Sequence, residues 1–166
     1  MRFLPAAAAL SLVVAVSASV GHGAERTPDA RAVALVAQGR AALQTGDTQA
    51  AIDSFEAALV IDPGYTQVYL DLADAARADG LQGKAIHYYR EALEREPKNF
   101  AAISGEGEAL LEKGAVEKAR RNLAQLESLC GEGCSETLQL AAAIDRGPPV
   151  MTAEAVTASE KVVTQN

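Results

Sequence analysis

The stretch AIDSFEAALVIDP, residues 51–63, recurs in pattern one period further along the chain as AIHYYREALEREP, residues 85–97. In both copies apolar residues occupy the first, second, fifth, eighth and ninth places, a spacing that forms one stripe along a helix. A proline ends each copy, and proline disfavours helical geometry in the residue that precedes it. The pattern therefore predicts two matching helices, each of which stops before its proline.

Glycines punctuate the chain with the same period, at Gly46, Gly80 and Gly114. A glycine just beyond a periodic segment signals a helix C-terminus, because it adopts the left-handed conformation at little cost. Each period thus predicts a helix, a turn at the glycine, a second helix and a stop at the proline. The predicted first helices share a large apolar residue followed four places later by a small one: Leu35 with Gly39, Tyr69 with Ala73, and Ile103 with Gly107. The small residue is expected to let the neighbouring helix approach.

A helix–turn–helix unit of about 34 residues, the spacing of these glycines, has the signature length of the tetratricopeptide repeat (TPR), and the chain resembles that family. The first repeat carries the resemblance at Gly39, Ala51, Phe55, Ala58 and Pro63, and the second at Ala73, Ala85, Tyr89, Ala92 and Pro97. Gln38 and Glu106 depart from it, because the family usually has leucine at these places. Phe55 and Tyr89 are expected to be buried between the helices of their own repeats and the next repeat.

The third repeat resembles the family less closely. Gly107, Ala119 and Leu123 fit the pattern, but Leu126 replaces the small residue and Arg120 replaces the isoleucine. No proline closes this repeat, and the chain reads Cys130-Gly131 where the proline is expected.

These features predict an all-α fold: a short right-handed α-solenoid of about three TPR helical hairpins with a C-terminal capping helix. We place the repeats at 32–65, 66–99 and 100–131, after a linker at 25–31. A capping helix at 132–146, with Ser135 as its N-cap, would cover the last apolar face, because terminal repeats need such a cover. The tail, 147–166, has few large side chains and no sustained period, so it is expected to be disordered.

The N-terminal segment, 1–24, has the layout of a secretory signal peptide. Met1-Arg2 supply a positive start, an apolar run extends from Phe3 to Val16, and small residues suitable for cleavage between 18 and 24 follow. The alternative, an uncleaved membrane anchor, needs about 20 apolar residues, more than this run supplies. The prediction is therefore an exported protein, periplasmic or secreted, with no membrane span after signal removal.

Composition and charge limit the classes of partner that are expected. Hydrophobic residues make up 49% of the chain but aromatic residues only 4%, which favours closely packed helices rich in alanine and leucine. A net charge of -7 offers no cationic surface that would release counterions from a phosphate backbone. Nucleic acid is thus not an expected partner, and anionic lipid surfaces are disfavoured.

Cys130 and Cys134 are the candidates for special chemistry. In an oxidising compartment, two cysteines at this spacing most simply form a structural disulfide, which would fix the turn that Pro63 and Pro97 fix in the earlier repeats. The same spacing occurs in certain copper chaperones, and a redox-active pair is a further alternative. Both lack support here, since the nearest histidine, His87, is far upstream of Cys130 and no βαβ setting is predicted.

No catalytic constellation is predicted, so the protein is expected not to be an enzyme and to need no cofactor. His87 lies beside two tyrosines in a predicted helix, the carboxylates are expected to face solvent along helices, and Gly105-Glu106-Gly107-Glu108 follows no strand and so is not a phosphate loop.

The resemblance implies binding of a peptide or partner helix on the concave surface, which the first helix of each repeat lines. The residues expected to project into that groove are Arg40, Gln67, Asp71, Asp74, Arg77, Ser104, Glu108 and Glu112. The set is acidic on balance, so the expected partner is a neutral or basic protein segment, unless these charges only solubilise the face. Two functions remain open: an adaptor or scaffold in a bacterial cell-envelope assembly, or a thiol-redox or metal-handling maturation factor that uses Cys130 and Cys134.

Overall fold

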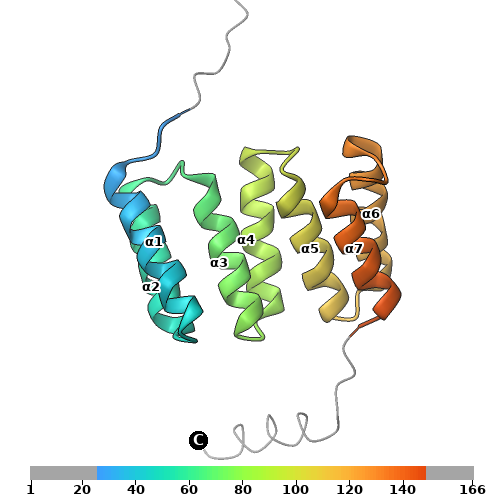
Figure 1. Cartoon of the computed structure of the whole chain (residues 1–166), viewed down its shortest axis with the longest axis horizontal. Coiled ribbons are helices and arrows are strands. Elements are labelled where there is room, and N and C mark those ends of the chain that lie inside the picture. Colours follow the sequence, from blue (N-terminus) through green and yellow to red (C-terminus); the bar gives the residue numbers. More distant parts are fainter. Residues whose placement is uncertain (1–25, 149–166) are drawn as a thin grey trace, which may run out of the picture.

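The computed structural model describes residues 26–148, which form seven α-helices and no strands (Figure 1). The helices are α1 (Ala30–Gln44), α2 (Thr48–Ile61), α3 (Thr66–Ala78), α4 (Gln82–Arg95), α5 (Phe100–Glu112), α6 (Val116–Cys130) and α7 (Ser135–Arg146). The prediction of an all-α repeat fold is confirmed. Consecutive helices pack as three hairpins, α1 with α2, α3 with α4 and α5 with α6, and the hairpins stack in chain order.

Local sequence explains where the helices begin and end. The side chains of Asp29, Asp47 and Asn99 cap α1, α2 and α5 by accepting hydrogen bonds from free backbone N–H groups at 2.8–3.1 Å. Gly46 and Gly80 adopt positive φ angles of 81° and 71° immediately after the first helices of their repeats. Left-handed backbone is what the glycine period predicted at these turns.

The small residues of the first helices allow close packing. A Cβ atom added to Gly39 would lie 2.4 Å from Cε1 of Phe55, and one added to Gly107 would lie 2.6 Å from Cδ2 of Leu140. Phe55 is fully buried and Tyr89 is nearly so, as the repeat pattern predicted. Glycine at these positions is therefore required by the approach of a neighbouring side chain.

The seventh helix covers the end of the stack. It packs against α5 and α6, and its Leu140 is fully buried with Ile103 and Leu126. Leu126, the large residue that replaces a small one in the third repeat, thus serves the contact with α7.

Two details of the predicted boundaries were wrong. Ser135 is the first residue of α7 and not its N-cap, because Cys134 occupies the cap position and the Ser135 hydroxyl donates to the Glu136 carboxylate at 2.7 Å. Helix α1 begins at Ala30, inside the predicted linker, because Asp29 caps it. The predicted signal peptide and most of the predicted tail lie outside the described residues. Within 26–148, none of the helices is both long and apolar enough to cross a membrane.

Candidate functional site

The first helix of each hairpin lines the inner face of the stack. Neighbouring first helices contact one another, α1 with α3 and α3 with α5, and α7 continues the row against α5. The second helices, α2, α4 and α6, make no such contacts with one another in the described part of the chain. The row of first helices is therefore the tighter, concave side, and α2, α4 and α6 form the convex side.

An arginine–aspartate pair joins α1 to α3 on the concave side. Arg40 donates from Nε and Nη2 to the two carboxylate oxygens of Asp71 at 2.8 and 2.9 Å, a bidentate arrangement. Hydrogen bonding to Asp71 raises the pKa of Arg40. Asp71 is buried although the sequence predicted solvent-facing carboxylates, because Arg40 supplies a partner for its charge.

A second ionic cluster joins α3 to α5. Arg77 donates from Nη2 to Glu108 at 2.8 Å, from Nε to Glu112 at 3.3 Å, and again from Nη2 to Glu112. Burial alone would lower the pKa of Arg77, but the surrounding hydrogen bonds and negative charges raise it. The cluster therefore holds a permanent positive charge among acidic groups.

Asp74 lies one turn from Arg77 on α3 and pairs with a buried tyrosine. Its carboxylate accepts a hydrogen bond of 2.5 Å from the hydroxyl of Tyr89, which comes from the second helix of the same hairpin. Partial removal of Asp74 from water by its neighbours raises its pKa. Burial, together with the charge of Asp74, also raises the pKa of Tyr89. Both groups hold their protons more tightly than they would in water.

The predicted groove residues differ in their accessibility. Asp74, Arg77, Glu108 and Glu112 lie together, and Arg40 and Asp71 form the pair described above. Gln67 is exposed near the loop between α2 and α3. Ser104 was wrongly predicted to project into the groove: it is only 2% exposed and donates to the backbone carbonyl of Glu136 at 3.2 Å, because α7 covers it.

The concave side also contains residues that the sequence did not single out. A cavity of about 600 Å³ lies between α3, α5 and the end of α7, and Gln82, Leu111 and Arg146 line it together with Arg77. Gln139 of α7 donates to Glu108 at 2.6 Å. No signal at these positions distinguished them, since their place in the groove depends on how α7 docks on α5.

The expectation that carboxylates face solvent was also wrong at two other positions. Asp62 is 2% exposed and accepts hydrogen bonds from the backbone N–H groups of Asp29 and Gly64 at 3.0 and 3.2 Å. Glu106, one of the departures from the repeat pattern, is buried and accepts from Arg90 at 2.7 Å and from Asn122 at 3.1 Å. Each carboxylate connects two elements of the fold by hydrogen bonds.

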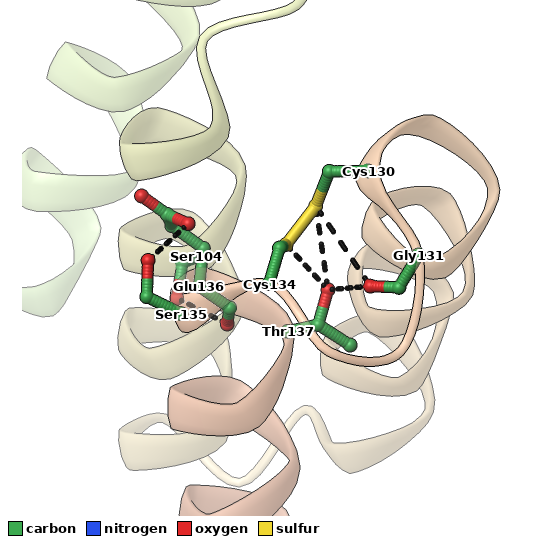
Figure 2. The surroundings of a disulfide bond; sticks show 7 residues. All are labelled: Ser104, Cys130, Gly131, Cys134, Ser135, Glu136 and Thr137. Carbon is green, nitrogen blue, oxygen red and sulfur yellow. Dashed lines mark hydrogen bonds between the residues drawn. A yellow bond between two sulfur atoms is a disulfide. The ribbon is translucent and has the colours of Figure 1, made fainter.

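The two cysteines lie at the junction of α6 and α7 (Figure 2). Their Cα atoms are 6.0 Å apart and their sulfur atoms are bonded in the structure. The buried Thr137 hydroxyl lies 3.0 Å from the sulfur of Cys134 and donates to the carbonyl of Gly131 at 3.0 Å. The loop thus connects the last repeat to the capping helix, far along the stack from Arg40. Oxidation of the pair in the cell stays a prediction.

The helical hairpins and the row of first helices define the class of protein: an all-α helical repeat protein. The tetratricopeptide repeat family profile matches residues 5–66 and 68–127, and the chain belongs to this family. Over 106 residues the chain is 35% identical to tetratricopeptide repeat protein 34 of Homo sapiens. That alignment covers 64% of this chain and only 19% of the human protein.

Solved structures of the same fold include peptide-binding domains. The first TPR domain of Spaghetti (RPAP3), bound to an HSP90 peptide, superposes with a TM-score of 0.64 at 18% identity, covering 72% of this chain and 98% of that one. The Sgt2 TPR domain of Aspergillus fumigatus gives 0.65 at 22% identity, with 76% and 91% covered. The type III secretion chaperone SycD of Yersinia enterocolitica, in complex with a peptide of the translocator YopD, gives 0.60 at 23% identity, with 77% and 93% covered. These similarities show the fold.

Proposed function

We propose that this protein is an adaptor or scaffold that holds a peptide or helix of another protein on its concave face, as part of a bacterial cell-envelope assembly. The observation that carries the proposal is the concave row of α1, α3, α5 and α7 with a cavity of about 600 Å³ beside Arg77. Structural neighbours solved with peptides support the same use of the fold.

The charges of this face favour a neutral or basic partner. Arg40 and Arg77 are engaged with Asp71, Glu108 and Glu112, so they are not free to receive an acidic segment. Asp74 accepts only a tyrosine hydroxyl and makes no ion pair with any described residue, so its carboxylate is available to a cation. Complementary charge at such a surface guides association and selects partners.

Capture from envelope extract tests this assignment. Immobilised wild type is compared with Asp74→Asn, which keeps the bond to Tyr89 but removes the charge, and with Asp53→Asn, which removes an exposed carboxylate from α2 on the convex side. The proposal expects a partner that wild type and Asp53→Asn retain to the same salt concentration. Asp74→Asn should release this partner at a lower salt concentration. Equal loss in both variants would contradict binding on the concave face.

The proposed location rests on the N-terminal segment, 1–24, whose charge, apolar run and small residues are typical of an exported chain. Fractionation of cells that express the full chain tests this point. We expect a processed form in the periplasm or medium whose N-terminus follows a residue between 18 and 24. An unprocessed chain in the cytoplasm would contradict export while leaving the concave binding face untouched.

The second candidate, a thiol-based maturation factor, rests on the bonded Cys130 and Cys134 at the junction of α6 and α7. In this function the pair would exchange electrons with a client dithiol while the repeats hold the client. Thiol titration of protein purified from the periplasm separates the two functions. A bridge that resists mild reductant supports the adaptor, and a readily reduced pair supports the thiol function.

A further inference from the structure

A cleft distinct from the cavity beside Arg77 gathers positive charge. It lies between α4 and the turn that joins α5 to α6, and has a volume of about 410 Å³. Arg90, Lys113 and Lys118 line it around an apolar floor formed by Ile86 and Leu110. None of the residues that line this cleft also lines the cavity beside Arg77, so the two sites are distinct.

The positive charges in the cleft are largely unneutralised. Lys113 and Lys118 are exposed and form no ion pair with any residue from 26 to 148. Arg90 donates from Nε to Glu106, but its side chain is 56% exposed and its Nη groups donate to no described residue. In a chain with a net charge of -7, such a convergence of cations is a local exception.

The preceding repeat shows that the fold does not require these cations. One repeat period earlier, Arg90 corresponds to Glu56, Lys113 to Asp79 and Lys118 to Lys84. The equivalent place between α2 and the α3–α4 turn therefore carries two carboxylates and one lysine. The positive charge is therefore specific to the cleft between α4 and the α5–α6 turn and is not a general feature of the repeat.

A glycine also leaves space at the α4 side of this cleft. Gly83 corresponds to Gln49, whose side chain lies on its own helix and donates to Asp53 at 2.8 Å. A Cβ atom added at Gly83 would lie 3.9 Å from Nζ of Lys113, so a side chain longer than alanine would extend toward the lysine. The absence of a side chain leaves the ammonium group accessible from the α4 side.

We propose that the cleft between α4 and the α5–α6 turn, which we call the basic cleft, binds an acidic peptide segment with carboxylate and apolar side chains. The cations match the carboxylates, and the floor of Ile86 and Leu110 matches an apolar neighbour. A peptide reaches the cleft locally, whereas an extended anionic surface, such as a membrane, also meets the repulsion of the whole chain at a net charge of -7.

Fluorescence anisotropy with a labelled peptide of alternating glutamate and leucine tests the basic cleft. Lys113→Glu and Lys118→Glu are each compared with Lys98→Glu, which changes the net charge equally in the exposed loop between α4 and α5. We expect each cleft variant to weaken binding by about tenfold, since reversing a charge that faces a charged partner both removes attraction and adds repulsion. Lys98→Glu should bind like wild type.

Two results would overturn the proposal. Equal weakening by all three lysine variants would show that only overall charge matters. The second result combines two observations: the peptide fails to bind wild type, and wild type binds phosphatidylglycerol vesicles or inorganic phosphate but Lys113→Glu does not. This result would assign the cleft to another anion. The substituted lysines are exposed, so each variant should keep the helical circular dichroism signal of wild type. This signal verifies that a loss of binding does not result from unfolding.

Discussion

Phe55 joins the first repeat to the second. It is fully buried, contacts the position of Gly39 on α1, and belongs to the same cluster as Val68 and Leu72 on α3. An aromatic ring buries a large apolar area, and the neighbouring helices cannot collapse fully onto the space that it leaves. The stability of this small array therefore depends strongly on single side chains.

Phe55→Ala should lower the free energy of unfolding by about 3–5 kcal/mol, the usual cost of truncating a buried aromatic residue. Val60→Ala is the matched control, because Val60 is 83% exposed on the same helix and should change stability by less than about 0.5 kcal/mol. Urea denaturation followed by circular dichroism measures both. A change below about 0.5 kcal/mol for Phe55→Ala would be incompatible with its place in the core.

Asp62 shows which residue-scale features the sequence left open. The repeat pattern placed Asp62 just before the helix-ending proline, and the stop is where it was predicted. The pattern did not show that its carboxylate would accept the N–H of Asp29 and pair with Arg26 at 2.6 Å. Those contacts depend on the path of the chain before α1, which has no counterpart in the other repeats.

The role of Asp62 predicts a pH dependence. The hydrogen bond from the Asp29 N–H group, with the pairing to Arg26, lowers the pKa of Asp62. A lowered folded-state pKa gives stability that is fully present above the ordinary value of about 4 and is lost as pH falls through the folded-state value. Asp62→Asn should thus be less stable than wild type at neutral pH, with a gap that narrows in acid. Urea denaturation at neutral and at acidic pH measures this difference in the free energy of unfolding, with Asp145→Asn as an exposed control. A gap that is independent of pH would contradict this role.

At the scale of elements, the glycine and proline period predicted the helices of the three hairpins closely. Turn chemistry at Gly46 and Gly80, and the prolines, are local signals that the sequence carries directly. The start of α7 was placed one residue late, because Ser135 is a good N-cap by type whereas Cys134 is held in the cap position by the loop. The sequence likewise could not show that α7 would cover Ser104, since docking depends on the packing of Leu140 with Ile103 and Leu126.

The cysteine loop predicts a stabilising crosslink between α6 and α7. Cys130→Ser with Cys134→Ser should lower stability by roughly 2 kcal/mol, because restored chain entropy favours the unfolded state. Partner binding should survive, since Asp74 lies on α3 and the loop follows α6. Thermal unfolding and partner affinity of the double variant are measured together. Loss of function with an unchanged midpoint would favour the thiol function.

At the scale of the whole molecule, the concave face was predicted as a surface but not as a network. The period placed Asp74, Arg77, Glu108 and Glu112 on first helices, and the structure brings these residues together. The pairing of the charges depends on side chains that reach from one first helix to the next. The paired residues are separated in sequence by slightly less or slightly more than one repeat period. The acidic balance was therefore readable in the sequence, whereas the engagement of both arginines was not.

The central claim, a partner segment held on the concave face, is tested most directly by photo-crosslinking in cells. A photoreactive amino acid replaces Ala78, which lines the same hollow on the concave side as Asp74, or Asp53 on α2; both positions are exposed. We predict a light-dependent adduct with a partner protein from position 78 and none from position 53. Adducts from position 53 alone, or equally from both positions, would contradict binding on the concave face.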